Sequence, residues 1–157
     1  MEDIRIEKAV ALFKEGFNCS QAVVAAFADE FGFTREQALR MSASFGGGIG
    51  RMRETCGAAC GLFMLAGLKG GAVEGADRNG KAANYALVQE LAEEFKQRNG
   101  ALKCADLLGL SNNEPVVSTP EQRTNQYYAK RPCVKMVEEA ARIWVEYLQR
   151  TLKVKKY

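Results

Sequence analysis

The stretch TCGAACGLFMLAGLKGG, residues 55–71, contains the longest apolar run of the chain. Thr55 is a residue type that caps helix N-termini, and the paired glycines at the end are typical of a helix C-terminus. We therefore predict a helix over residues 56–70. Gly57 and Gly61 lie one turn apart on this helix and form a small-residue face, which favours close packing against another helix. The run is too short to span a bilayer, which requires about 20 apolar residues.

Helical periodicity continues on both sides of this stretch. Asn18, followed three residues later by Gln21, forms a capping-box pattern, and Thr34 is a further N-cap. The predicted helices span residues 3–15, 19–31, 34–44, 56–70, 77–98 and a long segment that starts near Pro132, with a short helical turn at 104–109. We find no period-2 alternation typical of a strand. The sequence therefore predicts an all-α fold, a single-domain bundle of about five to six helices over residues 1–157.

The predicted helix at 77–98 carries one apolar stripe, and this stripe has two interpretations. Its members, which recur at helical spacing, are Tyr85, Val88, Leu91, Ala92 and Phe95. The stripe either closes the core of the monomer or forms the face of a homodimer. The sequence leaves both interpretations open.

The net charge and the N-terminal sequence limit which partners and which location we expect for this protein. Lysine and arginine exceed aspartate and glutamate by three residues, 22 against 19, which gives no reason to expect nucleic acid or an anionic membrane as partner. No apolar run is long enough for membrane insertion. The N-terminus, MEDIRIEKAV, has no secretory pattern, so we expect a cytoplasmic protein whose thiols stay reduced unless they bind metal or cycle.

Histidine is absent from the chain. Its absence excludes Ser-His-Asp and Cys-His catalysis, histidine-ligated zinc and histidine-ligated haem. Any metal would have to be bound mainly by sulfur.

Four of the five cysteines fall at or beside a predicted helix start: Cys19, Cys56, Cys104 and Cys133. A helix N-terminus carries about half a positive charge, and basic neighbours add to it, so we expect each sulfur to favour the thiolate. No C-x-x-C pair is present, which excludes a local zinc knuckle but leaves one assembled site possible. Any one of these cysteines, taken alone, is equally compatible with a small core residue.

The fifth cysteine and the glycines are weaker candidates for residues of the functional site. Cys60 lies one turn after Cys56 and is interpreted as a core residue, with an extra ligand or a resolving thiol as alternatives. The segment FGGGIG, residues 45–50, either presents backbone N–H groups to a bound cofactor or is a tight connection before the next helix. The candidate cofactor-binding glycines are Gly46, Gly47, Gly48 and Gly57.

Together these residues resemble a known family. Cys19, the segment FGGGIGRMRETCGAACG at 45–61, Cys104 and Cys133 are similar to the C_GCAxxG_C_C family of small redox-active proteins. The resemblance covers nearly the whole chain and implies that these four cysteines form the active set, with Cys60 at a variable position. A related module in split-Soret cytochromes, where it accompanies haem-binding sequence that this chain lacks, favours iron–sulfur chemistry.

Three functional hypotheses follow, and the sequence leaves open whether the protein is an enzyme. In the first, the four cysteines converge and bind an iron–sulfur cluster, most simply [2Fe–2S], for electron transfer or redox sensing with an unknown redox partner. In the second, the same four cysteines act as catalytic thiols in disulfide exchange without metal. In the third, they hold zinc in a structural or regulatory Cys₄ module. We favour them in that order.

Overall fold

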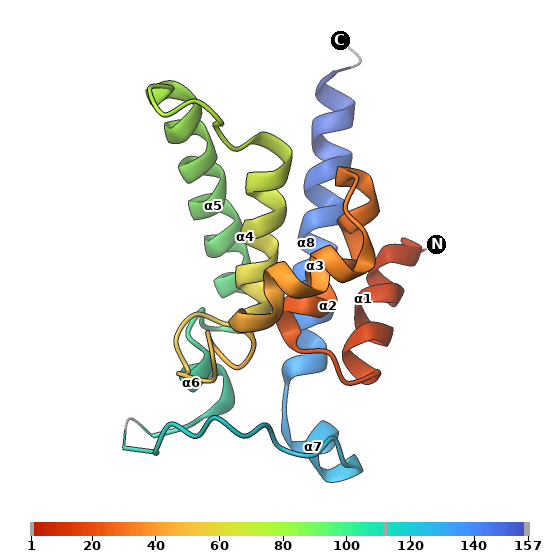
Figure 1. Cartoon of the computed structure of the whole chain (residues 1–157), viewed down its shortest axis with the longest axis vertical. Coiled ribbons are helices and arrows are strands. Elements are labelled where there is room, and N and C mark those ends of the chain that lie inside the picture. The colour runs from red at the N-terminus through yellow and green to blue at the C-terminus, as the bar shows by residue number, and fades with distance from the viewer. Residues whose placement is uncertain (1, 112, 156–157) are drawn as a thin grey trace.

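The computed structural model describes residues 2–111 and 113–155, and this part of the chain contains eight α-helices and no β-strand (Figure 1). The helices are α1 (Ile4–Lys14), α2 (Cys19–Phe27), α3 (Arg35–Ser42), α4 (Gly57–Gly70), α5 (Arg78–Asn99), α6 (Cys104–Leu108), α7 (Asn125–Lys130) and α8 (Cys133–Val154). Short 3₁₀ turns, Ala28–Phe31 and Ala43–Phe45, extend α2 and α3. The predicted all-α fold is confirmed. None of the described helices combines the length and apolar character that crossing a bilayer requires.

Helix α2 lies at the centre of the core, where it packs against α1, α4 and α8. Seven of its nine residues are buried, mostly alanine and valine. The contact with α4 is close because Gly61 faces α2: a Cβ at this position would lie 3.0 Å from the Cβ of Val23 and 3.1 Å from the carbonyl oxygen of Ser20. The small-residue face predicted for α4 therefore lets the two helices approach closely. The largest fully buried side chains around this contact are Trp144, Phe13, Phe27, Phe95, Leu62 and Leu65.

Side-chain caps fix where α2 and α3 begin. The Asn18 side chain accepts a hydrogen bond from the N–H of Gln21, and the Gln21 side chain accepts one from the N–H of Asn18. Thr34 and Gln37 form the same reciprocal pair at α3. These capping boxes satisfy N–H groups that a helix start leaves without partners. Cys19 is therefore held as the first residue of α2.

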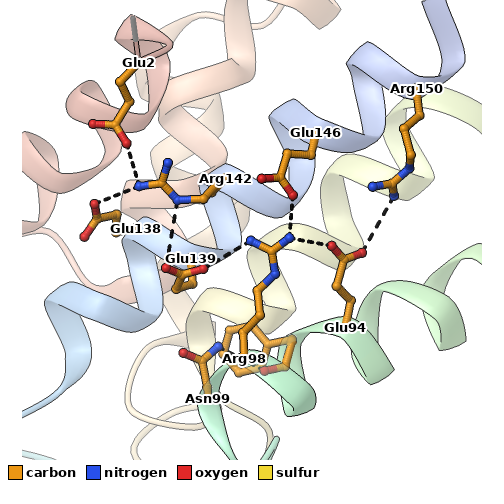
Figure 2. Close-up of polar contacts among 10 residues, drawn as sticks. Glu2, Glu94, Arg98, Asn99, Glu138, Glu139, Arg142, Glu146 and Arg150 are labelled. Atoms are coloured by element: carbon orange, nitrogen blue, oxygen red, sulfur yellow. Dashed lines mark hydrogen bonds and ion pairs between the residues drawn. The ribbon is translucent and has the colours of Figure 1, made fainter. Parts of the chain in front are cut away.

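Helix α5 lies at the edge of the molecule and is joined to α8 by charged side chains (Figure 2). Arg98 of α5 pairs with Glu94 at 2.7 Å, with Glu139 of α8 at 3.2 Å, and also with Glu146 of α8. Only Leu91 and Phe95 of α5 are fully buried. The predicted apolar stripe therefore closes the core of the monomer at Leu91 and Phe95, whereas Tyr85 is 60% exposed, and the homodimer face stays a prediction.

Two details of the elements also differ from the sequence prediction. Cys56, not Thr55, is the N-cap of α4, because Thr55 forms an isolated antiparallel bridge with Lys103 instead. Helix α7 lies in a polar segment without apolar periodicity, and its start was not predicted. Figure 1 shows α6, α7 and the chain between them gathered at the end of the molecule where α8 begins.

Candidate functional site

The four cysteines predicted at helix starts line one cavity of about 300 Å³, named here the cysteine cavity. Cys19, Cys104 and Cys133 are the first residues of α2, α6 and α8, and Cys56 is the N-cap of α4. Four separate helices thus point their N-termini at one place. Cys60 does not line this cavity: it is buried, and its thiol lies 3.8 Å from the carbonyl oxygen of Thr55.

Backbone pairing places Cys56 beside Cys104. The N–H of Cys56 donates to the carbonyl of Leu102 at 2.8 Å, and the N–H of Cys104 donates to the carbonyl of Glu54 at 2.6 Å. A further bond links the N–H of Ala105 to the carbonyl of Arg53. These bonds hold the segment before α4 against the start of α6, so two cysteines far apart in sequence meet.

The glycine segment wraps this pair through a run of left-handed backbone. Residues 47 to 51 all have positive φ, between 57° and 75°, and this run includes two residues that are not glycine, Ile49 and Arg51. A Cβ at Gly48 would lie 2.5 Å from the Cβ of Cys104, and one at Gly57 would lie 3.3 Å from the Cβ of Cys19. These two glycines therefore leave the space that the cysteines occupy.

All four candidate glycines, Gly46, Gly47, Gly48 and Gly57, line the cysteine cavity. The N–H groups of residues 49 to 54 donate to backbone carbonyls, so they are engaged within the loop. Contact between the glycines and a cofactor stays a prediction.

Four arginines complete the wall of the cavity: Arg51, Arg53, Arg123 and Arg131. The guanidinium of Arg53 lies 3.8 Å from the sulfur of Cys104 and donates to it. Arg123 donates to the carbonyls of Phe13 and Phe17 at the end of α1, and its guanidinium lies 4.2 Å from the centre of the Phe13 ring. Positive charge from arginine side chains and helix N-termini therefore predominates around the cavity, where Glu121 also lies and pairs with Arg131.

The thiols differ sharply in acidity. A hydrogen bond from Cys19 lowers the pKa of Cys133 to about 7 against the opposing effect of burial, and Arg131, Tyr127 and Arg123 lower it further. The same hydrogen bond, together with burial, raises the pKa of Cys19 well above its ordinary value. Cys133 is thus the sulfur most easily ionised, with Cys19 as its hydrogen-bonded neighbour.

Burial dominates at the other two cavity cysteines. It raises the pKa of Cys56 to about 12, although the N–H groups of Ala59 and Ala58 at the start of α4 act in the opposite direction. Burial also raises the pKa of Cys104, with Arg53 opposing it. The expectation that every helix start favours the thiolate is therefore wrong for three of the four cysteines. Loss of hydration dominates at Cys56 and Cys104, and at Cys19 burial adds to the effect of the hydrogen bond to Cys133.

The next question is whether the cysteines are arranged to bind a single metal ion. In the described residues, no group of three or more cysteine, aspartate or glutamate side chains is arranged to hold one metal ion. Tetrahedral Cys₄ zinc, with Zn–S bonds of about 2.3 Å, requires sulfurs about 3.8 Å apart. Binding of a metal or cluster by the four cysteines stays a prediction.

Sequence reasoning missed two contributors to the site. Arg123 was not singled out, because it lies in a polar segment and acts on carbonyls more than a hundred residues away. Tyr127 was not singled out either, yet it lines the cavity and its hydroxyl lowers the pKa of Cys133. No local pattern marks either residue.

Comparison with known proteins gives one match. A family model described as "Putative redox-active protein (C_GCAxxG_C_C)" matches residues 17–147. This range includes all four cavity cysteines. Neither the curated proteins nor the solved structures gave a match.

Proposed function

Because this chain belongs to the C_GCAxxG_C_C family of redox-active proteins, we propose that its cysteine cavity holds an iron–sulfur cluster for electron transfer or redox sensing. The residues that would hold it are Cys19, Cys56, Cys104 and Cys133. When bound, such a cluster supplies one-electron redox chemistry.

One observation carries this proposal: four cysteines, each at the start of a different helix, line a single cavity. A four-thiolate cluster is anionic, and the helix N-termini and arginines around the cavity are suited to stabilise negative charge. The four cysteines of the cavity meet the ligand count of a cluster. Burial of Cys56 and Cys104 limits access of water to the sulfurs.

The test is to purify the protein without oxygen and to measure iron, acid-labile sulfide and the visible spectrum together. We expect about two irons and two sulfides per chain, the composition of [2Fe–2S]. Cys56→Ser should abolish the absorption. Cys60→Ser is the matched control, since Cys60 lies one turn later on the same helix and outside the cavity. Protein that stays colourless after anaerobic reconstitution, or equal loss in both variants, contradicts the proposal. One zinc per chain without sulfide would instead support the structural Cys₄ hypothesis.

A second function, thiol–disulfide exchange, is favoured by the pair Cys133 and Cys19. Ionised Cys133 would attack the disulfide of a partner protein, forming a mixed disulfide and releasing one partner thiolate. Cys19 would then lose its proton and attack the sulfur of Cys133, which releases the second partner thiolate. The pair is oxidised to a disulfide and the partner is reduced by the same two electrons. The reducing cytoplasm, the location that we propose, would return the pair to thiols.

This alternative is distinguished by trapping. Cys19→Ser should accumulate the mixed disulfide at Cys133, because no neighbouring thiol remains to resolve it. Cys60→Ser should accumulate none. Absence of a mixed disulfide in reduced, metal-free Cys19→Ser protein exposed to a disulfide reagent would contradict the exchange mechanism.

A further inference from the structure

A second cavity, of about 520 Å³, adjoins the cysteine cavity. It lies between the end of the glycine segment, the start of α6 and residues 113–121, a segment named here the strap. Arg51, Arg53 and Arg131 line both cavities. The second cavity, named here the strap cavity, therefore shares an arginine wall with the site that holds the cysteines.

The two central arginines of this wall lack anionic partners. In the part of the chain that the structure describes, no carboxylate lies within 4.0 Å of the guanidinium of Arg51 or Arg53. Arg51 donates instead to the carbonyls of Val117 and Thr119 in the strap. Arg131 already pairs with Glu121. The remaining acids of the lining, Glu54 and Glu114, are exposed.

Gathering these cations has a physical cost. Burial lowers the pKa of Arg51, and so does repulsion from the nearby charges of Arg53 and Arg131, while the charge of Glu121 acts in the opposite direction. Like charges held close together with partial desolvation destabilise one another unless an anion lies between them. The positive charge of this wall is therefore only partly offset, because Glu121 is already paired with Arg131.

The backbone at both arginines is also strained. Arg51 has φ 61° and Arg53 has φ 62°, in the left-handed region that residues with a side chain rarely adopt. Strain of this kind concentrates where the placement of a side chain serves a function. Here the strained backbone places the side chains of Arg51 and Arg53 on one wall, where neither forms an ion pair with a described carboxylate.

We propose that Arg51 and Arg53, assisted by Lys103 and Arg131, bind the acidic group of a small organic molecule in the strap cavity. A guanidinium fork pairs with both oxygens of a carboxylate or phosphate, which makes this group the matching chemistry. The volume lies in the range of cavities that bind small organic ligands. The rest of the ligand would contact an apolar part of the lining, which consists of Met52, Pro115, Val116 and Val117.

The location gives this site a consequence for the cysteines. The guanidinium groups that would bind the acid also line the cysteine cavity, and Arg53 donates to the sulfur of Cys104. A bound acid would partly neutralise the positive charge that the sulfurs experience. The site is independent of whether the cysteines hold a cluster or act as thiols.

The test is isothermal titration calorimetry on the full chain with two probes, inorganic phosphate and the small dicarboxylate malonate, at constant ionic strength set with chloride. We expect at least one probe to bind saturably, and the two titrations separate phosphate from carboxylate chemistry. Arg53→Gln should weaken that binding at least tenfold, and Lys103→Gln, at an exposed and unstrained position, should weaken it about threefold. Arg40→Gln is the matched control, because Arg40 is exposed and pairs only with Glu36.

Two results would overturn the proposal: no saturable binding of either probe, or equal weakening by Arg40→Gln and Arg53→Gln, which would indicate a general effect of net charge. Circular dichroism of each variant establishes that it is folded. Cys19→Ser separates this proposal from the proposed function, because Cys19 lies outside the strap cavity. This variant should lose the chemistry of the sulfur site and keep the affinity for the anion.

Discussion

Two regions of the molecule are held together in different ways. The bundle, consisting of α1, α2, α4 and α8, is joined by fully buried apolar side chains. The cap, consisting of residues 45–56, 100–111 and 113–132, lies at the end where α8 begins (Figure 1). Every described side chain from 111 to 122 is exposed, and the cap depends on backbone pairing and on arginines that donate to carbonyls. The comparison indicates that the bundle provides stability while the cap provides the geometry of the site.

The largest effect should come from the bundle. Trp144→Ala removes a fully buried indole from α8 and should lower the free energy of unfolding by about 3–5 kcal/mol, measured by chemical denaturation. Trp144→Phe is the matched variant and should cost much less. It keeps most of the volume and removes an indole N–H that has no hydrogen-bond partner in the described structure. Equal losses in the two variants would mean that packing at this position is not what stabilises the bundle.

The next effect should come from the glycine segment of the cap. Gly48→Ala places a Cβ 2.5 Å from the Cβ of Cys104 and 2.8 Å from backbone atoms of Arg53 and Glu54. It should cost about 2–4 kcal/mol, from left-handed strain and steric overlap together. Gly50→Ala also has positive φ, but its Cβ would approach no atom closer than 3.9 Å, so strain alone should cost about 1–2 kcal/mol. Denaturation curves of the two variants measure the difference, and identical curves would contradict the close approach to Cys104.

A smaller and more local effect should follow Arg123→Ala. The change removes the hydrogen bonds to the carbonyls of Phe13 and Phe17, which tie the cap to α1. We expect hydrogen exchange of the α7 amides to become about tenfold faster, because local opening becomes easier by about 1.4 kcal/mol. The amides of α2 should be nearly unchanged. Equal acceleration in α2 and α7 would show that cap and bundle open as one unit.

The smallest effect concerns Tyr127, whose hydroxyl lowers the pKa of Cys133. Tyr127→Phe should raise the pKa of Cys133 above about 7, so the alkylation rate of metal-free, reduced protein at pH 7 should fall. Tyr128→Phe, the adjacent position, should leave the profile of rate against pH unchanged. Because the fold lowers the pKa of Cys133, ionisation of this thiol increases the free energy of unfolding. This contribution is fully present above the pKa of the unfolded thiol and is lost as the pH falls through about 7.

The sequence predicted the bundle well, because its signals are local. Asn18 and Thr34 cap the helices that they were expected to cap, and helical periodicity predicted α1 and α8. Helix α5 was less well predicted, since its stripe depends on how far α4 and α8 cover it, and Tyr85 lies beyond that cover.

The site was predictable in its sulfurs and not in its surroundings. Capping and proline patterns indicated the helix starts near Cys19, Cys56 and Cys133, no such pattern marks the start at Cys104, and family resemblance grouped the four. The acidity of Cys133 depends on Cys19, Arg123 and Tyr127, which reach it only through the tertiary fold. The left-handed conformation at Arg51 could not be predicted from the sequence either, because no propensity favours this conformation in a residue with a side chain.

The four helix starts that meet at the cysteine cavity are between about 30 and 50 residues apart in sequence. A group bonded to all four sulfurs would close three successive loops of the chain, which restricts the unfolded state much as a set of cross-links would. No isolated segment contains the complete donor set, so capture of such a group would come late in folding, after the helices have docked. Loss of the group would then slow refolding little, and its main effect would be faster unfolding.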